Sequence, residues 1–188
     1  NNVEINKLPR FNKGEWWVQD YSSMLPIHLT DNLKGKEILD MCAAPGGKAF
    51  QAISSEANVD IIEKNPKRAQ ILKENLNRLN YKNNIKITDA LNLPETKKYD
   101  FIFIDAPCSS VGTIRKNPEI FFRKNNPKFD QIIELQYSLL NKAKKIIKSK
   151  GIIIYMVCSF LEIETTKQIN NFLKKNSKFN IERFKINE

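Results

Sequence analysis

Hydrophobic residues along this chain follow two alternating patterns. Short runs rich in β-branched and aromatic residues predict strands at residues 37–41, 59–63, 85–88, 101–105, 151–157 and 179–184. Segments between them carry an apolar residue at every third or fourth position and predict helices at residues 48–54, 66–79, 132–146 and 163–174. Strands that alternate with helices in this way form right-handed βαβ units. The pattern predicts an α/β fold with a Rossmann-like, doubly wound, mostly parallel sheet and helices on both faces.

The chain length and the absence of a linker indicate one domain. The 188 residues contain no internal repeat and no Ser- or Gly-rich linker. Residues 1–34 are interpreted as a lead-in segment, and residues 35–188 as the domain itself. Within the domain, Asn65 is expected to cap a helix that begins at Pro66.

The composition is typical of a globular protein without a membrane span. Hydrophobic residues make up 41% and charged residues 28% of the chain. No apolar run reaches the roughly 18 residues of a membrane-spanning helix, and the first residues lack the layout of a signal peptide. Three cysteines are too few for a disulfide framework, so reduced thiols and a cytoplasmic location are expected. One histidine and no Cys-x-x-Cys motif favour neither zinc nor another metal, and a monomer is expected.

The charge balance favours a polyanionic partner. The formal net charge is +10 and the pI is about 9.5, although a general lysine-rich composition would explain this equally well. A local basic cluster is more specific, and it consists of Arg115, Lys116, Arg123, Lys124 and Lys128. Phe121 and Phe122 lie within the same segment. Basic residues with aromatic neighbours suit a nucleic-acid backbone with bases available to stack.

A turn of small residues follows the first predicted strand. It consists of Cys42, Ala43, Ala44, Pro45, Gly46, Gly47 and Lys48. Such a turn lets the backbone approach a ligand and presents N–H groups at a helix N-terminus. The turn is not a G-x-G-x-x-G motif, and it is not a phosphate loop because Ala49 follows the lysine.

Two acids follow the next predicted strands. Glu63 ends the second strand, where an acid can accept both ribose hydroxyls of a nucleoside. Asp89 follows the third strand, where it can bond an adenine amino group. Each acid alone is more often a solvated loop residue, but their order at successive strand ends predicts a nucleoside pocket.

Two cysteines also follow predicted strands. Cys108 lies in the sequence Asp-Ala-Pro-Cys-Ser after the strand at 101–105, and Cys158 follows the strand at 151–157. Ligands bind outside the carboxyl ends of the strands in open α/β sheets, so both thiols are expected to face one crevice. The alternative for either residue alone is a small buried hydrophobic side chain.

These motifs resemble the RsmB/Sun/NSUN family of S-adenosylmethionine-dependent RNA cytosine-C5 methyltransferases. The resemblance rests on Asp-x-Cys-Ala-Ala-Pro-Gly-Gly-Lys at 40–48, Asp-Ala-Pro-Cys-Ser at 105–109 and Cys-Ser at 158–159. Residues 14–23 and 112–119 are similar to further family segments, so the resemblance covers nearly the whole chain. Residues 16–20 look most like the branch that acts on small-subunit ribosomal RNA.

The resemblance implies S-adenosyl-L-methionine as cofactor and RNA, above all ribosomal RNA, as partner. It assigns the backbone of residues 42–47 and the Lys48 side chain to the methionine part of the cofactor. It further implies that Glu63 binds the ribose, that Arg68 supports this acid and the cofactor end, and that Asp89 lies beside the adenine. The basic residues Arg115, Lys116, Arg123 and Lys124 are expected to contact RNA.

The resemblance also assigns the chemistry. It implies that Cys158 is the nucleophile, that Cys108 aids product release, and that Asp105 lies between the methyl donor and the cytosine. Cytosine C5 is a poor nucleophile until a thiolate adds at C6, after which C5 can take a methyl group. Basic surroundings are expected to lower the pKa of the Cys158 thiol, and the target base must be single-stranded or flipped out.

A second hypothesis comes from departures from the family pattern. Met156 and Val157 precede Cys158 where the family has Ser/Cys-Thr, and Glu164-Thr165-Thr166 replaces a more acidic Glu-x-Glu segment. The chain also begins near the catalytic region and stops before the family's closing strand, so a fragment of a longer protein is expected. These features favour a catalytically weak or inactive RNA-binding or ribosome-assembly module that keeps the cofactor fold. Binding of S-adenosylmethionine would discriminate between the two hypotheses.

Overall fold

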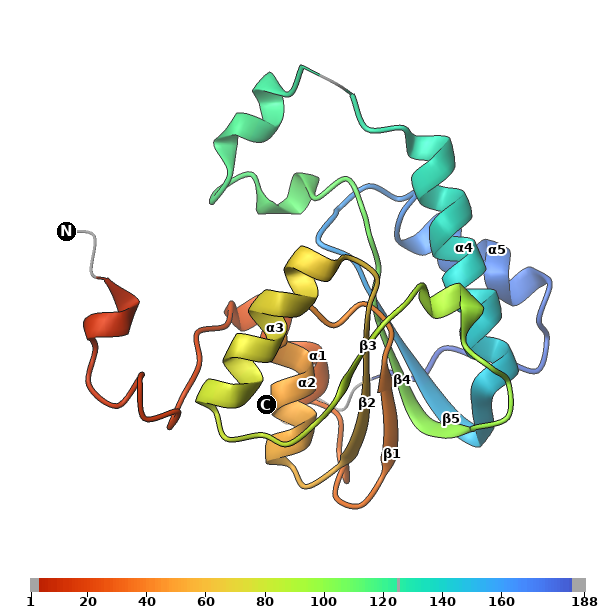
Figure 1. Cartoon of the computed structure of the whole chain (residues 1–188). Coiled ribbons are helices and arrows are strands. Elements are labelled where there is room, and N and C mark those ends of the chain that lie inside the picture. The colour runs from red at the N-terminus through yellow and green to blue at the C-terminus, as the bar shows by residue number, and fades with distance from the viewer. Residues whose placement is uncertain (1–3, 125, 184–188) are drawn as a thin grey trace.

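The computed structural model describes residues 4–124 and 126–183, and its centre is one parallel sheet (Figure 1). The described strands are β1 (Glu37–Asp40), β2 (Asn58–Glu63), β3 (Ile85–Ile87), β4 (Tyr99–Asp105) and β5 (Ile147–Met156). They lie in the order β3-β2-β1-β4-β5, and every neighbouring pair is parallel. Ile38 of β1 pairs with Val59 of β2 on one side and with Phe101 of β4 on the other. The predicted α/β class and doubly wound sheet are confirmed.

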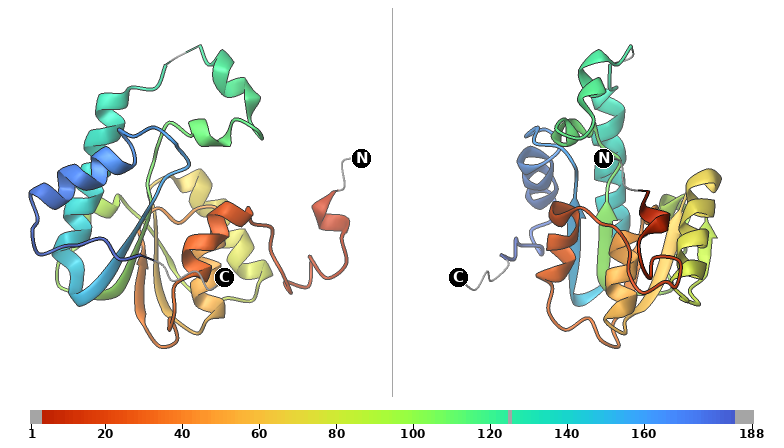
Figure 2. Two further views of the ribbon diagram at one scale, coloured as in Figure 1. Left: turned by 180° about the vertical axis from the view of Figure 1, so that it is seen from behind. Right: turned by 90° about the vertical axis from the view of Figure 1, so that its left-hand side faces the viewer.

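Helices cover both faces of the sheet (Figure 2). One face carries α1 (Tyr21–His28), α2 (Gly47–Ser54) and α3 (Pro66–Arg78), and the other carries α4 (Phe129–Ile146) and α5 (Thr166–Lys174). A parallel sheet buried on both faces requires apolar side chains on both sides of each central strand. Accordingly, Ile38 packs into one hydrophobic cluster and its neighbour Leu39 into the other.

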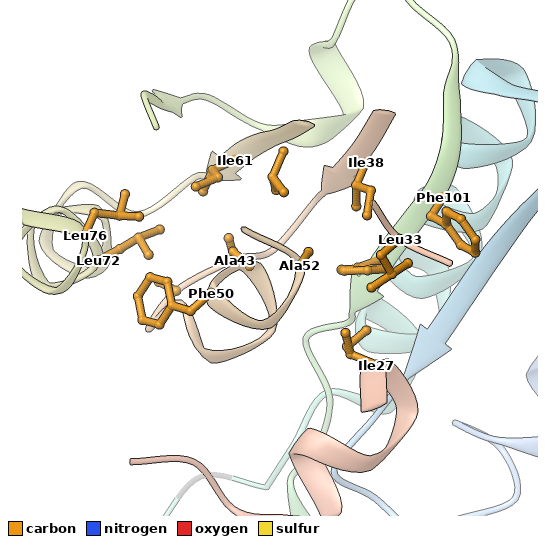
Figure 3. Packing of buried hydrophobic residues seen from close by; sticks show 14 of the residues in the cluster. Ile27, Leu33, Ile38, Ala43, Phe50, Ala52, Ile61, Leu72, Leu76 and Phe101 are labelled. Atoms are coloured by element: carbon orange, nitrogen blue, oxygen red, sulfur yellow. The ribbon is translucent and has the colours of Figure 1, made fainter. Parts of the chain in front are cut away.

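The core between the sheet and the first three helices is closely packed (Figure 3). Phe50 of α2 and Leu72 and Leu76 of α3 lie in it, each 2% exposed or less. Ile27 and Leu33 reach the same core from the lead-in region, so α1 is anchored to the domain. Asn65 caps α3 as predicted, because its side chain accepts from the N–H groups of Lys67 and Arg68.

The remaining described elements are short 3₁₀ helices. They are η1 (Ile5–Lys7), η2 (Ala90–Asn92), η3 (Val111–Thr113) and η4 (Pro118–Phe122). The two last lie above the carboxyl ends of the strands in Figure 1. Arg78 at the end of α3 binds the segment that precedes α1. Its guanidinium stacks 3.8 Å from the Phe11 ring centroid and donates to the carbonyl oxygens of Phe11 and Trp16.

Several expected elements differ from the structure at their ends, as α4 does by beginning at Phe129 instead of residue 132, and one expected strand is missing from the described residues. The helix expected at 163–174 begins at Thr166, because residues 162–165 form turns. The strand expected at 151–157 begins at Ile147, and its register shifts around Lys150, which has φ of 63°. The strand expected at 179–184 is wrong over residues 179–183, since Phe179 packs edge-on against Phe172 instead of pairing with the sheet; residue 184 lies outside the described residues. Across the described part of the chain, no helix has the length and apolar character to cross a membrane.

Candidate active site

The candidate site lies where the strand order reverses, between β1 and β4. From β1 the chain turns to β2 on one side, whereas β4 begins the other half of the sheet. The loops that leave the carboxyl ends of such strands form a crevice, and ligands of doubly wound folds bind there. The turn at residues 41–46 and the loop at residues 106–110 therefore define the crevice.

The first turn is shaped by Gly46. Its φ of 119° is in the left-handed region, and a Cβ atom there would lie 2.1 Å from the Phe50 ring. Glycine is therefore required both by the backbone and by the packing beneath the turn. The Ala43 N–H donates to the Ile62 carbonyl oxygen at 3.0 Å, which fixes the turn to the end of β2. The predicted stretch from Cys42 to Gly47 thus forms a tight shelf ahead of α2.

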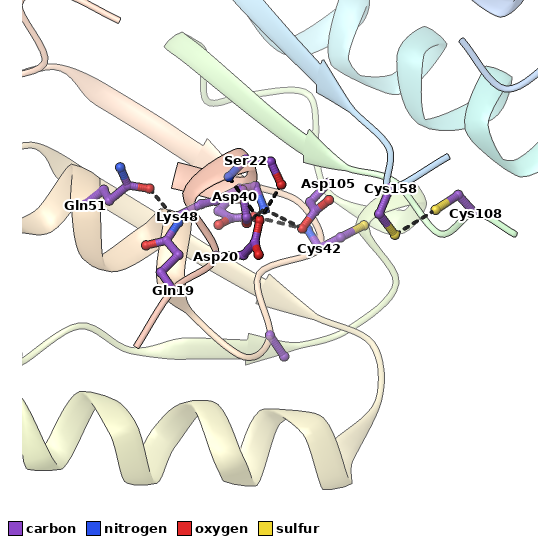
Figure 4. Close-up of polar contacts among 12 residues, drawn as sticks. Gln19, Asp20, Ser22, Asp40, Cys42, Lys48, Gln51, Asp105, Cys108 and Cys158 are labelled. Carbon is purple, nitrogen blue, oxygen red and sulfur yellow. Dashed lines mark hydrogen bonds and ion pairs between the residues drawn. The ribbon is translucent and has the colours of Figure 1, made fainter. Parts of the chain in front are cut away.

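Lys48 and Asp105 form an ion pair across the crevice (Figure 4). Lys48 Nζ lies 2.7 Å from Asp105 Oδ2 and 2.8 Å from Ser23 Oγ. The Lys48 side chain is 11% exposed, whereas Asp105 is 36% exposed and open to the crevice. The pair joins the start of α2, the end of β4 and, through Ser23, helix α1 in one place.

Asp40 is a site residue that the sequence interpretation did not single out. It ends β1, is 1% exposed, and its Oδ2 atom is buried without a hydrogen-bond partner among the described residues. Burial raises its pKa to about 7, although the nearby Lys48 charge opposes this shift. The Cys42 N–H donates to the other carboxylate oxygen, Oδ1, at 3.4 Å. The free Oδ2 atom beside the crevice is suited to receive a cationic or hydrogen-bonding group of a ligand.

Glu63 ties the first turn to the start of α3. One carboxylate oxygen accepts from the Ala44 N–H at 3.3 Å, and the other accepts from the Asn65 N–H at 2.8 Å. Arg68 Nη1 lies 3.9 Å from the carboxylate, and the same guanidinium donates to the Ala44 carbonyl oxygen. Glu63, Arg68 and the turn therefore form one connected unit.

Asp89 is held in place by two partners. It caps η2 by accepting from the Leu91 N–H at 3.0 Å, and it pairs with Lys64 at 2.6 Å. Its side chain is 23% exposed. An adenine contact would therefore have to share this carboxylate with Lys64.

A cavity of about 670 Å³ opens beside the Lys48–Asp105 pair. Asp20, Ser23, Asp40, Cys42, Lys48 and Asp105 are among the residues that line it. The structure brings only part of the predicted site into this cavity, since its lining residues do not include Ala44, Gly46, Glu63, Arg68, Asp89, Cys108 or Cys158. The cavity is of the size that small-molecule sites have.

The two predicted thiols lie next to each other. Cys108 Sγ is 3.2 Å from Cys158 Sγ, and Ser110 Oγ lies 3.4 Å from the latter sulfur. The hydrogen bond from Cys108 lowers the pKa of Cys158 to about 6, against the opposing effects of burial and of the Asp105 charge. The same contact holds the pKa of Cys108 far above its ordinary value. The contact therefore favours ionisation of Cys158 over ionisation of Cys108.

The basic cluster does not account for this activated thiol. Arg123 donates to the Ser109 carbonyl oxygen at 3.0 Å, and Lys116 pairs with Asp20 of the lead-in segment. Arg115 and Lys124 are exposed on the segment above the crevice. The expectation that basic surroundings lower the thiol pKa is thus wrong, because hydrogen bonds from Cys108 and Ser110 cause the shift.

The fold and this crevice define the class. A parallel sheet in this order, with a small-residue turn after β1 and a buried acid ending β2, is the class I fold of S-adenosylmethionine-dependent methyltransferases. The family model described as "16S rRNA methyltransferase RsmB/F" matches residues 27–188. The chain therefore belongs to the RsmB/F family of 16S rRNA methyltransferases.

Individual relatives agree with this assignment. The chain is 36% identical over 178 residues to ribosomal RNA small subunit methyltransferase B of Photorhabdus laumondii, covering 92% of this chain and 42% of the relative. It is 37% identical to the protein of the same name from Proteus mirabilis, covering 90% of this chain and 41% of the relative. The chain thus spans about two-fifths of the length of these curated relatives.

Solved structures match as well. NSun6 from Pyrococcus horikoshii with SFG, an S-adenosylmethionine analogue, has a TM-score of 0.82 and 27% identity, covering 92% of this chain and 46% of that one. A methyltransferase homolog from Pyrococcus horikoshii has a TM-score of 0.77 and 28% identity, covering 94% and 56%.

Proposed function

We propose that this chain binds S-adenosyl-L-methionine and transfers its methyl group to C5 of a cytosine in RNA, with ribosomal RNA as the substrate. The observation that carries the proposal is the activated thiol pair, with Sγ atoms 3.2 Å apart, at the end of the sheet where Asp105 meets Lys48. C5 methylation requires a thiolate as nucleophile, an acid beside the base and a bound methyl donor, and this crevice offers groups suited to each. The names of the curated relatives support ribosomal RNA as substrate.

The cofactor fits the residues of the crevice. The shelf at residues 42–47 with Lys48 would hold the methionine part, and Glu63 with Arg68 the ribose end, with Asp89 near the adenine. Asp40 adds a buried carboxylate oxygen, Oδ2, that has no partner among the described residues and suits the ammonium group of the cofactor. The bound cofactor supplies an electrophilic methyl group on a sulfonium.

The nucleophile is Cys158. Its thiolate would add to C6 of the cytosine, which would make C5 electron-rich enough to accept the methyl group that the bound cofactor supplies. Asp105, together with its ion-pair partner Lys48, would supply the proton that N3 takes up as negative charge builds on the ring, and would take it back when the thiolate leaves. Loss of the C5 proton and elimination of the thiolate then yield 5-methylcytosine and restore Cys158.

Cys108 is suited to the release step. Its thiol keeps its proton as long as the neighbouring thiolate is present, because the hydrogen bond to that thiolate, then burial and the thiolate charge, raise the pKa of Cys108. When Cys158 is bonded to the base, the charge is gone and Cys108 ionises more easily. It then serves as the base that accepts the C5 proton and so allows the product to leave.

RNA is proposed to approach along the basic segment above the crevice. Arg115 and Lys124 are exposed there, and Phe122 is 84% exposed. Exposed cations attract phosphates, and an exposed ring can stack on an unpaired base.

Two cysteine variants test the proposal. Cys158→Ala is expected to abolish methyl transfer to small-subunit ribosomal RNA while calorimetry still detects S-adenosylmethionine binding. Cys108→Ala is expected to accumulate a covalent RNA adduct that survives denaturing electrophoresis. Retained transfer in Cys158→Ala would contradict the mechanism. RNA binding without any cofactor binding in the unsubstituted chain would favour the inactive RNA-binding module instead.

A further inference from the structure

We propose that Glu164 is a positioning residue that holds the two thiol loops in register. The effect of Glu164 on methyl transfer rests on the proposed function. Its effect on the position and pKa of the thiols does not, and is measured by alkylation of Cys158. Glu164 lies in the turn before α5 and is fully buried, at 0% exposed. It does not line the crevice cavity, so its influence on the site passes through the residues that it bonds.

The Glu164 carboxylate bonds both loops at the same time. Oε1 accepts from the Ser109 N–H at 2.8 Å, and Oε2 accepts from the Ser159 hydroxyl at 2.6 Å. The Ser109 hydroxyl donates to the carboxylate as well. These serines directly follow Cys108 and Cys158 in the chain. One side chain therefore fixes the residue after each thiol.

A second buried side chain completes the arrangement. Gln136 of α4 is 0% exposed and donates through Nε2 to Glu164 Oε1 at 3.3 Å and to the Pro107 carbonyl oxygen at 3.0 Å. The Tyr155 hydroxyl donates to the Glu164 carbonyl oxygen at 2.9 Å. The loop after β4, the end of β5 and helix α4 thus converge on this acid.

The acid is held ionised by neutral donors. Burial opposes its ionisation, but hydrogen bonds from Ser109 and Ser159 outweigh burial and keep the Glu164 pKa below its ordinary value. No ion pair to Glu164 is found in the part of the chain that the structure describes. Removing such a carboxylate leaves several buried donors without an acceptor. The loss of folding stability is then far larger than the loss on removing an acid that is exposed to solvent.

The thiol contact depends on this arrangement. The Cys108–Cys158 hydrogen bond forms only when the two loops keep their relative position, and this bond is the main cause of the lowered Cys158 pKa. The sign of a change in that pKa separates two possible effects of Glu164. Loss of a nearby negative charge alone would lower the pKa of Cys158, whereas loss of the thiol contact would raise it. Other charged groups facing the thiol pair, above all Asp105, are unchanged by a substitution at 164.

The test compares Glu164→Ala with Glu164→Gln. Alanine removes all acceptors, so the midpoint of Cys158 alkylation by iodoacetamide is expected to move upward from about 6 by at least ~1 pH unit, toward the ordinary value of about 8.5. Glutamine keeps one acceptor for the Ser109 N–H, and its amide can donate to the serine hydroxyls, which rotate to accept. Its midpoint is expected to stay near that of the unsubstituted chain.

Controls keep the result interpretable. Glu162→Gln removes an exposed acid that pairs with Lys167 at 3.1 Å, and it is expected to leave the midpoint unchanged. If Glu164→Ala does not fold, Ser109→Ala and Ser159→Ala each remove one hydroxyl donor and are expected to raise the midpoint by smaller amounts. A midpoint that stays or falls in Glu164→Ala, or in both serine variants, would overturn the proposal.

Kinetics test the catalytic consequence separately. With ribosomal RNA as substrate, Glu164→Ala is expected to lower kcat about tenfold or more with little change in the KM for RNA, and Glu164→Gln is expected to recover most of it. Equal losses of kcat in the alanine and glutamine variants would contradict the positioning role. If the unsubstituted chain transfers no methyl group, the proposed function fails, but the alkylation midpoints still decide the role of Glu164.

Discussion

Cys108 Sγ and Cys158 Sγ lie 3.2 Å apart because they leave neighbouring strands at matching positions. Asp105 of β4 pairs with Met156 of β5, and the Ala106 N–H donates to the Met156 carbonyl oxygen at 2.9 Å. The thiols follow within three residues of this register. Sheet pairing therefore brings the two thiols together, and their contact lowers the pKa of Cys158 and raises that of Cys108.

The reactivity of Cys158 is expected to follow pH. The thiolate is the reactive form, so alkylation and methyl transfer should rise as the pH passes about 6 and level off above it. Cys108→Ala removes the hydrogen bond and is expected to shift the alkylation midpoint upward. Peptide mass spectrometry after a short pulse of iodoacetamide measures each thiol separately.

Cys42 provides an internal control for that experiment. Burial raises the pKa of Cys42 to about 12, so it should remain unmodified at neutral pH. A Cys158 midpoint near the ordinary thiol value in the unsubstituted chain would contradict the assignment of the activated sulfur.

Lys48→Met is expected to disable transfer more than it disturbs the fold. The substitution keeps the stem but removes the partner of Asp105 and Ser23, so a charge placed for the reaction is lost from the crevice. Loss of one such group lowers kcat by about 10²-fold. Single-turnover assays measure the transfer step, and thermal unfolding monitors the fold.

Lys97→Met is the matched control for Lys48→Met. Lys97 pairs with Glu37 and Asp60 at 2.9 and 3.0 Å, and its side chain is 45% exposed. Exposed pairs contribute ~1 kcal/mol or less, so transfer should be unaffected. Equal rates in Lys48→Met and the unsubstituted chain would show that the buried pair has no part in the reaction.

The sequence predicts the helices, the strands and the two cysteines better than it predicts the buried residues that contact them. Strand runs, the Asn65 cap and the first turn depend on local signals, and Cys108 and Cys158 are expected together because both follow adjacent strands. Asp40 falls in the first predicted strand and opens the 40–48 motif, but nothing local shows that one of its carboxylate oxygens is buried without a partner. Glu164 falls in the helix expected at 163–174 and in a segment noted only for its departure from the family pattern. Its contacts exist only once two distant loops meet, and a serine after each cysteine is the one local signal of them.

The mistaken strand at 179–184 also reflects contacts between distant segments that the local sequence does not show. Phe179 and Ile181 alternate with polar residues, which is the strand pattern, but a strand also needs a neighbour with which to pair. Phe172 of α5 offers an aromatic contact at a centroid distance of 5.5 Å, and Phe179 packs there. Tertiary packing outweighs a short alternating pattern.

Gly46→Ala is expected to destabilise the fold by about 3 kcal/mol or more. Alanine is strained in the left-handed backbone conformation of this position. Its Cβ atom would also lie 2.1 Å from the Phe50 ring and 2.6 Å from Leu72, so backbone strain and overpacking add. Gly35→Ala is a matched control, because Gly35 has φ of 70° but nothing within 4 Å of the added Cβ. Denaturant titrations should show a much larger loss for Gly46→Ala. Equal losses would mean that packing under the turn contributes nothing.

Asp40→Asn is expected to change how stability depends on pH. The folded-state pKa of Asp40 is raised from 3.8 to about 7 by burial, so the folded protein binds this proton more tightly than the unfolded chain does. Its contribution to stability is therefore fully present below about pH 4, declines between pH 4 and 7, and is lost above that. The variant cannot titrate, so its stability relative to the unsubstituted chain should rise across this window, by up to about 4 kcal/mol. Urea unfolding at several pH values measures the difference in free energy of unfolding between the two proteins. Any effect of the new amide that does not depend on pH leaves the slope of this difference against pH unchanged. Glu162→Gln controls for loss of one negative charge, and a pH-independent difference for Asp40→Asn would rule out the raised pKa.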